Sequence, residues 1–310
     1  MAAQMGIAIL GIYVADTAYL AERMPQVGET ISGSGFSLGP GGKGSNQAVA
    51  AGRAGARVSF ISKIGDDTFG KMALEIYAEA GVTPKVEVMA DMPSGAAFIF
   101  VNDQTGENAI IVYPGAAGTI TSADVEEHRA VIESSKVFVT QLEQPPDAAL
   151  TALTLARSAG VTTVFNPAPA NPFDAACYGQ TDYFVPNESE AAAIVGFKID
   201  TEEDARRAGD LFLERGVGTA IITLGAKGVY LHGPGISTRV PAMANAPVID
   251  TAGAGDAFIG GFAAALSEGQ GVEQAVRMGC ATAGIAVTRR GTAPAMPARA
   301  EIDAMMGQGA

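Results

Sequence analysis

Short apolar runs alternate with helical segments along most of the chain. Strand-like runs lie at 7–13, 58–64, 136–140, 161–165, 183–185, 220–223 and 229–232. Segments with helical patterning lie at 46–54, 69–80, 147–159, 189–195, 202–215, 256–267 and 272–288. This alternation predicts an α/β fold built from βαβ units, in which a mostly parallel central sheet has helices on both faces.

Two stretches, 14–38 and 96–113, depart from this alternation. Each is typical of short strands joined by turns, and the polar segment 102–108 has the composition of a hairpin loop. They predict a small sheet outside the main one, which must cover a surface or leave its edges exposed. Because no linker, repeat or low-complexity segment interrupts the chain, we expect residues 1–310 to form one domain.

Composition and charge exclude several classes of function. A net charge of −13 disfavours a nucleic-acid surface, because nucleic-acid phosphates require basic residues. The two cysteines, Cys177 and Cys280, have no motif spacing, and two histidines are too few for a histidine-based metal cluster. The segment Met1–Leu10 lacks signal-peptide features and no apolar run has the character of a membrane span. We therefore expect a soluble cytoplasmic protein with no membrane or nucleic-acid partner.

The segment 250–256, Asp-Thr-Ala-Gly-Ala-Gly-Asp, is chemically the most informative. Its small residues leave backbone amides uncovered where a helix is predicted to begin, and such amides favour a phosphate. Asp256 would lie in the first helical turn, where its carboxylate can take a proton from a hydroxyl beside that phosphate. Taken alone, the segment is better explained as a Gly-rich turn with an Asp near a helix start.

The second informative segment, 39–47, reads Gly-Pro-Gly-Gly-Lys-Gly-Ser-Asn-Gln. Four glycines among its first six residues let the backbone approach a small ligand, and Lys43 and Asn46 offer donors to hydroxyl groups. The segment also satisfies G-x-G-x-x-G literally, but it does not follow the first strand of a dinucleotide-binding unit. Gly44 stands after Lys43 where a P-loop requires Ser or Thr.

Together, Gly-Gly-Lys-Gly-x-Asn-Gln and Asp-Thr-x-Gly-Ala-Gly-Asp resemble the paired signatures of the ribokinase family, the phosphofructokinase B type of sugar kinase. The resemblance runs from Gly11 to about Ile302. It implies a ribokinase-like three-layer α/β/α fold and ATP-dependent phosphorylation of a sugar hydroxymethyl group, with D-ribose as the expected acceptor. It also implies Mg²⁺ and K⁺ as cofactors, and a lid at 14–38 and 96–113 that closes over the sugar and pairs two copies into a homodimer.

The same resemblance implies roles for individual residues. Asp256 is the general base, beside an anion hole of Ala252, Gly253, Ala254 and Gly255. Sugar contacts fall on Asp16, Gly42, Lys43, Asn46, Glu143 and Asp256. ATP contacts fall on Asn187, Glu190, Thr223, Gly225, Lys227, Gly228, Gly255 and Cys280. The monovalent-cation ligands are Asp250, Ala252, Ala286, Arg289, Gly291 and Ala295, mostly through carbonyl oxygens. Several of these residues have ordinary explanations too, such as helix caps for Asp16 and Asn187.

The sequence departs from the family pattern at a few of these positions. Val14, Ala117 and Cys280 stand where the family often has polar residues, and Ala295 replaces a frequent Ser. Because Val14 cannot hydrogen-bond a sugar hydroxyl, other acceptors stay open: 2-deoxyribose, fructose, a keto-deoxy sugar acid or a nucleoside. A sugar-binding regulator without catalysis and a nucleotide-cofactor oxidoreductase are further alternatives. The regulator would be expected to lack Asp256 or the anion hole, and the oxidoreductase would bind NAD.

Overall fold

The computed structural model describes residues 6–244 and 246–307, so the first five residues of the segment Met1–Leu10, considered above for signal-peptide features, lie outside it. A nine-stranded sheet runs through the centre in the order β13-β12-β11-β10-β9-β8-β1-β4-β5. Its strands are β1 (Ile7–Leu10), β4 (Val58–Gly65), β5 (Val82–Met89), β8 (Val137–Thr140), β9 (Thr162–Phe165), β10 (Tyr183–Phe184), β11 (Thr219–Thr223), β12 (Val229–Gly233) and β13 (Ile236–Val240). Neighbours from β11 to β5 pair in parallel, whereas β12 and β13 pair antiparallel. The predicted mostly parallel sheet is confirmed.

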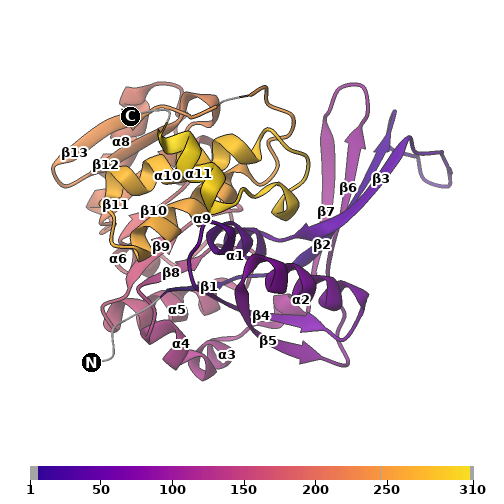
Figure 1. Cartoon of the computed structure of the whole chain (residues 1–310), viewed down its shortest axis with the longest axis horizontal. Helices are drawn as coiled ribbons and strands as arrows, with labels where there is room; N and C mark the ends of the chain where they lie inside the picture. Colours follow the sequence, from indigo (N-terminus) through magenta and orange to yellow (C-terminus); the bar gives the residue numbers. More distant parts are fainter. Residues whose placement is uncertain (1–5, 245, 308–310) are drawn as a thin grey trace.

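Helices cover both faces of this sheet, as β1 illustrates (Figure 1). Ile7 and Ile9 belong to one buried cluster, and Ala8 and Leu10 belong to the other, because successive strand residues point to opposite faces. The first layer contains α1 (Lys43–Arg53), α2 (Thr68–Ala80), α9 (Ala254–Ser267), α10 (Val272–Ala286) and α11 (Arg299–Gly307). The second contains α3 (Ser122–Glu127), α4 (Arg129–Glu133), α5 (Pro146–Ser158), α6 (Ala176–Gly179), α7 (Glu188–Val195) and α8 (Glu202–Glu214).

A separate four-stranded sheet projects from one side of the body (Figure 1). Its order is β3-β2-β6-β7, formed by β2 (Val14–Ala21), β3 (Gly35–Gly41), β6 (Ser94–Asn102) and β7 (Asn108–Gly115). Strands β2 and β6 pair in parallel, and the two outer pairs are antiparallel. The small sheet expected from 14–38 and 96–113 is therefore present, and its strands β3 and β6–β7 extend a few residues beyond those limits.

The elements absent from the sequence-based prediction are short or polar. Strand β5 lies at the edge of the main sheet, contains Pro84 and alternates little, so its pattern carries a weak strand signal. Helix α1 begins at Lys43, three positions before the predicted start at 46. Its N-cap is Gly42, so no polar capping residue marks this start in the sequence. Three short 3₁₀ turns complete the chain: η1 (Ala116–Thr119), η2 (Gly225–Lys227) and η3 (Ala293–Ala295).

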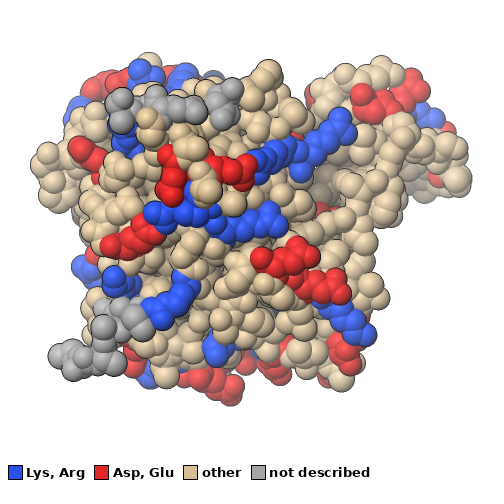
Figure 2. All heavy atoms as spheres, viewed as in Figure 1, with Lys and Arg blue, Asp and Glu red and all other residues tan. Residues whose placement is uncertain are grey.

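Acidic and basic side chains are interspersed over the face of the body shown in Figure 2, whereas the visible part of the small sheet is mostly uncharged. That face has no extended basic surface, in agreement with the net charge of −13. Within 6–244 and 246–307, no helix combines the length and the apolar character that a membrane crossing requires.

Candidate active site

Helix α9 begins at the segment predicted to bind an anion. Its N-cap is Gly253, whose φ of 71° lies in the left-handed region that favours glycine. The Ala252 amide donates to Asp250 Oδ1 at 2.9 Å, and the Ala254 amide donates to the Thr251 carbonyl at 3.2 Å. The following amides, of Gly255 and Asp256, belong to the first turn of the helix, where amides lack intrahelical acceptors. A Cβ built at Gly255 would meet nothing within 4 Å, so space for an anion lies beside these amides.

Asp256 lies in the first turn of α9, as predicted, and its side chain is held by helix α1. Asn46 Nδ2 donates to Asp256 Oδ2 at 3.1 Å, and Gln47 Nε2 donates to Oδ1 at 3.0 Å. The two helices approach closely at Gly260, where a Cβ would lie 2.8 Å from the amide nitrogen of Ala51. The small residues of both helices therefore bring the two sequence motifs, more than 200 positions apart, into direct contact.

The charges around Asp256 form one coupled group. Burial raises the pKa of the Asp256 carboxyl, against the opposing effects of Lys43 and of the two amide hydrogen bonds. Burial works to lower the pKa of the Lys43 ammonium, but Asp256, Glu143 and Glu190 together outweigh it and raise that pKa. Lys43 is thus a half-buried ammonium group whose charged form is favoured by three neighbouring acidic side chains.

A pocket of about 230 Å³ opens beside Asp256 at the carboxyl ends of the strands, where ligands collect in open α/β sheets. It joins Asp256 and the start of α9 to residues from α1, β9, α7 and β11. Its lining consists of Lys43, Asn166, Ala168, Val185, Asn187, Glu190, Thr223, Thr251, Gly253, Ala254, Gly255, Asp256 and Ile259. The structure thereby brings together the predicted base, three of the four predicted anion-hole residues (all but Ala252) and four of the predicted ATP contacts, namely Asn187, Glu190, Thr223 and Gly255.

Other predicted ATP contacts lie outside this lining. Lys227 lines a separate pocket of about 140 Å³, and its Nζ donates to the Asp200 carbonyl at 3.0 Å. Gly228 has φ 97°, and a Cβ there would lie 2.5 Å from Ala242 N. Backbone conformation and packing therefore explain this glycine without a ligand. Cys280 is buried in α10, where burial raises the pKa of its thiol to about 12. Gly225 is the first residue of the turn η2, two positions after Thr223.

Asn187 is the N-cap of α7, which is its ordinary structural explanation. Its Oδ1 accepts from the Glu190 amide at 2.8 Å, and Glu190 Oε2 accepts from the Asn187 amide at 2.9 Å. Both side chains also line the pocket, and burial raises the pKa of Glu190. Capping and ligand contact are compatible here, because the cap fixes where the two side chains lie.

Three of the predicted sugar contacts, Gly42, Lys43 and Glu143, meet at the start of α1. The Lys43 amide donates to Glu143 Oε2 at 2.7 Å, joining the first turn of α1 to the chain beyond β8. Gly42 has φ 89°, and a Cβ there would lie 2.6 Å from the Ile12 carbonyl oxygen. Burial raises the pKa of Asp16 to about 6, and nearby Asp256 adds to that shift. Burial likewise raises the pKa of Glu143 to about 7. Carboxyl groups shifted in this way are typical of ligand sites.

The predicted cation ligands lie where two loops meet. Asp250 Oδ1 accepts from the Ala252 amide, and Asp250 Oδ2 accepts from the Gly291 amide at 2.9 Å. The Ala286 carbonyl accepts from the Arg289 amide at 3.0 Å, and the Arg289 guanidinium pairs with Glu301. Ala295 ends the turn η3. The residues supply backbone carbonyl and carboxylate oxygens, the donor type that suits a hard cation.

Three polar residues of the site were given no role from the sequence. Gln47, Gln141 and Asn166 are buried and linked by hydrogen bonds behind Asp256. The sequence does contain an indication of Gln47, because Asn46 and Gln47 are adjacent polar residues in an otherwise small and apolar helical stretch. Of the two, Asn46 alone is predicted to contact the sugar. Gln141 and Asn166 follow strands β8 and β9, the positions where site residues of an α/β sheet are expected.

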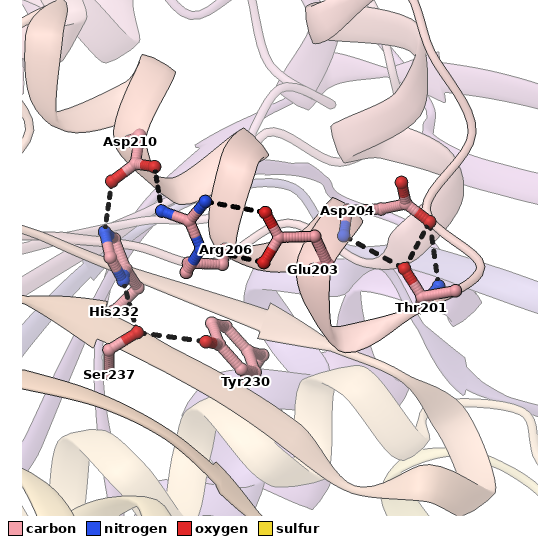
Figure 3. Close-up of polar contacts among 8 residues, drawn as sticks. All are labelled: Thr201, Glu203, Asp204, Arg206, Asp210, Tyr230, His232 and Ser237. Carbon is pink, nitrogen blue, oxygen red and sulfur yellow. Dashed lines mark hydrogen bonds and ion pairs between the residues drawn. The ribbon is translucent and has the colours of Figure 1, made fainter.

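A second polar network lies near the β12–β13 edge of the sheet (Figure 3). None of its residues lines this pocket. His232 contacts Asp210 Oδ1 through Nε2 and Ser237 Oγ through Nδ1, both at 2.9 Å. Asp210 also accepts from Arg206 Nη1 at 2.7 Å within α8, and the two contacts of His232 tie α8 to β12 and β13. Although Ser, His and Asp meet here, none of these residues lines the pockets described above. The network therefore stabilises packing.

Comparisons with known proteins agree with this geometry. The pfkB family of carbohydrate kinases matches residues 5–299. A ribokinase from Haemophilus influenzae is 37% identical over 296 residues, which cover 95% of this chain and 96% of that protein. A deoxyribokinase from Salmonella typhimurium is 33% identical and covers 94% of this chain and 96% of its own length. The structure of an Arabidopsis thaliana ribokinase complexed with ribose and ATP is 28% identical, with a TM-score of 0.90, and covers 97% of this chain and 98% of its own. The chain therefore belongs to the pfkB family of carbohydrate kinases and is an ATP-dependent sugar kinase.

Proposed function

We propose that this kinase transfers the γ-phosphoryl group of ATP to the exocyclic hydroxymethyl of D-ribose and releases D-ribose 5-phosphate and ADP. The observation that carries the proposal is the position of Asp256 between the amides that begin α9 and the cluster of Asp16, Asn46 and Glu143. A carboxylate in this position faces both the phosphate side and the sugar side. The similarity to ribokinases over nearly the whole chain supports ribose as the acceptor.

Asp256 acts as the general base. Its carboxylate accepts the proton of the sugar hydroxyl as the new O–P bond forms, and the bond from the γ-phosphorus to the bridging oxygen of ATP breaks to release ADP. The amide hydrogen bonds from Asn46 and Gln47 favour the ionised carboxylate, against the effect of burial, and hold its oxygens in place. The buried Oδ1 of Asn46 has no protein partner within the described chain, so it is available to accept from a sugar hydroxyl.

The start of α9 binds the transferring phosphoryl group. The amides of Gly253 and Gly255 would contribute to the anion hole directly, whereas Ala252 and Ala254, whose amides donate within the loop, would shape it. Lys43 lines the same pocket and adds a half-buried positive charge. We infer that it serves the phosphate as well as the sugar hydroxyls.

Sugar and nucleotide occupy the two sides of Lys43. Asp16, Gly42, Asn46 and Glu143 would bind the sugar, with the carboxylates accepting from its hydroxyls. Asn187, Glu190 and Thr223 line the pocket at the nucleotide side, and Gly225, Lys227, Gly228 and Cys280 would extend this surface toward the base of ATP.

Mg²⁺ and K⁺ have distinct places in this proposal. No group of three metal-binding side chains occurs within 6–244 and 246–307, so Mg²⁺ would be held mainly through the phosphates, with Glu190 nearby. It would neutralise phosphate charge. K⁺ would bind the oxygens of Asp250, Ala252, Ala286, Arg289, Gly291 and Ala295. Asp250 already joins these two loops, so the cation would stabilise the loop that shapes the anion hole.

The whole chain acts as one domain, and the four-stranded sheet β3-β2-β6-β7 acts as a lid that closes over the sugar. The lid also has apolar residues exposed on both faces of its edge strand β7, where Ile110, Ile111, Val112 and Tyr113 are each at least 50% exposed. Exposed apolar edges are usually covered, which supports a homodimer formed through the lid. Sedimentation of wild type against Ile111→Lys tests this: a monomeric wild type would contradict it.

A cytoplasmic location, where ATP is supplied, fits the two free cysteines.

Release of ADP from Mg-ATP, measured against ribose, 2-deoxyribose, fructose, sugar acids and nucleosides, tests the acceptor. We expect ribose to give the highest kcat/KM and K⁺ to stimulate more than Na⁺. A second candidate is 2-deoxyribose, because Val14 offers no hydrogen bond and a deoxyribokinase is 33% identical. Asp256→Asn is expected to lower kcat by about 10²–10⁴-fold. Retention of more than about a tenth of wild-type kcat would remove Asp256 from the role of base.

A further inference from the structure

Three buried side-chain amides form a hydrogen-bonded group beside Asp256, and of these Gln47 contacts its carboxylate. Gln47 and Gln141 are 0% exposed and Asn166 is 6% exposed. Burial of an amide is unfavourable unless its donors and acceptors are paired, and aliphatic side chains would fill the same space without that cost. Three neighbouring amides behind the base therefore point to a role beyond packing.

The hydrogen bonds of these residues fix the direction of each amide. Asn166 Nδ2 donates to the Val185 carbonyl at 2.8 Å, so Asn166 Oδ1 is left to face Gln47. Gln47 Nε2 then donates to Asn166 Oδ1 at 3.4 Å and to Asp256 Oδ1 at 3.0 Å. Gln47 Oε1 accepts from Gln141 Nε2 at 2.5 Å. Turning the Gln47 amide over would put its oxygen against the Asp256 carboxylate and its NH₂ group against that of Gln141.

We propose that Gln47 is a positioning residue, held in one orientation by Gln141 and Asn166, that fixes the Asp256 carboxylate for proton transfer. We call these three residues the amide relay. The inference rests on the proposed function, because it assumes that Asp256 is the base. It adds that the ends of three neighbouring strands, β8, β9 and β10, determine the geometry of that base through Gln141, Asn166 and the Val185 carbonyl.

The relay also joins the base to the sugar side. Gln141 lies two positions before Glu143, and Glu143 accepts the hydrogen bond of the Lys43 amide at the start of α1. Gln47 lies one turn further along α1. A displacement of the segment from Gln141 to Glu143 would therefore move the first turn of α1 at both Lys43 and Gln47, and with it the hydrogen bond from Gln47 to Asp256.

Other charged groups also face Asp256. They are Lys43 from α1, Asp16 from β2, Glu143 beyond β8 and Glu190 from α7. Replacing a neutral glutamine leaves all of these charges in place. A change in the pH dependence of the reaction after such a replacement would therefore report the lost hydrogen bond to Asp256.

The first test is Gln47→Met, which keeps the length of the side chain and removes its amide. We expect kcat to fall about 10- to 100-fold, since a hydrogen bond to a charged group is lost. The KM for ATP should change less than about threefold. The acid limb of the plot of kcat/KM against pH should move up by about one unit, because a donor to the ionised form lowers a carboxyl pKa.

Gln141→Met tests the relay without touching Asp256. It should shift the acid limb in the same direction by a smaller amount. In the double variant, the loss of kcat should not exceed that of Gln47→Met by more than about twofold, because Gln141 acts through Gln47. The matched control is Gln144→Met: Gln144 is equally buried, but its amide donates to Thr140 Oγ1 and to the Gln141 carbonyl. Its acid limb should stay at the wild-type pH.

Thermal melting establishes which variants are folded, and Gln141→Met decides the question if Gln47→Met does not fold. Unchanged acid limbs in the folded relay variants, together with an inactive Asp256→Asn, would overturn the positioning role and leave the proposed function intact. An active Asp256→Asn would instead defeat the proposed function and this inference with it. A strictly additive double variant would also contradict the relay.

Discussion

The hydroxyl of Thr292 donates a 2.9 Å hydrogen bond to the backbone carbonyl of Pro40. Pro40 lies in β3, two residues before Gly42, at the point where the proposed lid joins the body. Thr292 also packs against the start of α9, because a Cβ built at Gly253 would lie 3.3 Å from the Cβ of Thr292. One side chain thus contacts both the base of the lid and the loop that would bind phosphate.

Thr292→Val should weaken this connection while conserving volume. Loss of a neutral hydrogen bond is worth about 1 kcal/mol, so we expect kcat/KM for the sugar to fall up to about fivefold. The melting temperature should fall by only a few degrees. Steady-state kinetics with the sugar varied measure the effect, and Thr288→Val, whose hydroxyl donates to the Ile285 carbonyl within its own helix end, is the control. Equal losses in the two variants would contradict a link between Thr292 and the lid.

Arg53 holds the turn that carries Ala295. Its Nη1 lies 3.1, 3.2 and 3.0 Å from the carbonyl oxygens of Ala293, Pro294 and Met296. We expect Arg53→Met to cost about 2 kcal/mol of stability, since these are charge-assisted hydrogen bonds. If Ala295 binds K⁺, the concentration of K⁺ that half-saturates the rise in melting temperature should increase several-fold. Arg290→Met removes the same charge from an exposed neighbouring position and should change neither quantity by as much.

The pH dependence of sugar phosphorylation should reflect the coupled carboxyls of Asp16, Glu143 and Asp256. The pKa of Asp16 is raised to about 6 and that of Glu143 to about 7, chiefly by burial. Both must be ionised to accept from sugar hydroxyls, so kcat/KM should decline as the pH falls below about 7. An isolated carboxyl would give this limb near pH 4. Asp16→Asn should alter the shape of the limb, since the coupled group then loses one titrating member. A limb below pH 5 in the wild type would contradict the prediction.

The same shifts have a consequence for stability. Because folding raises both pKa values, the folded protein binds more protons than the unfolded chain between about pH 4 and pH 7. Stability from these groups is therefore present below about pH 4 and lost as the pH rises through 6 to 7. Melting temperatures of the unliganded protein across this range, compared with those of Glu143→Gln, should show a smaller decline in the variant. An identical decline would show that Glu143 does not titrate in this window.

The strands and helices of the main sheet could be predicted because their burial follows their sequence pattern. The run 58–64 and the helix at 69–80 are examples, and both were placed within one residue of β4 and α2 at each end. Strand β5 was missed because an edge strand with Pro84 need not be apolar on both faces. The lid strands were recognised by their turns, since their exposed apolar residues do not follow an inside–outside alternation.

The site could be predicted only where a motif is local. Asp256 and the glycines before it are close in the sequence, so uncovered backbone amides next to a carboxylate can be predicted from their spacing alone. The contact between Asn46 and Asp256 depends on how closely α1 approaches α9, which is decided by Gly260 and the alanines opposite it. Gln141 and Asn166 reach Gln47 through the order of the strands in the sheet, and no spacing in the sequence contains that order.

Val14 gives the most direct test of which sugar is used. It is 4% exposed on β2, two positions before Asp16, and Gly95 on the paired strand leaves room for it. An apolar side chain there cannot pair a sugar hydroxyl, so the wild type should discriminate weakly between ribose and 2-deoxyribose, with kcat/KM values within about tenfold. Val14→Asn supplies an amide and should raise the ratio for ribose over 2-deoxyribose about five- to tenfold. Val14→Ala, which removes volume without adding a polar group, should leave that ratio within about twofold. A wild type that prefers ribose by more than about a hundredfold would show that another residue reads the hydroxyl.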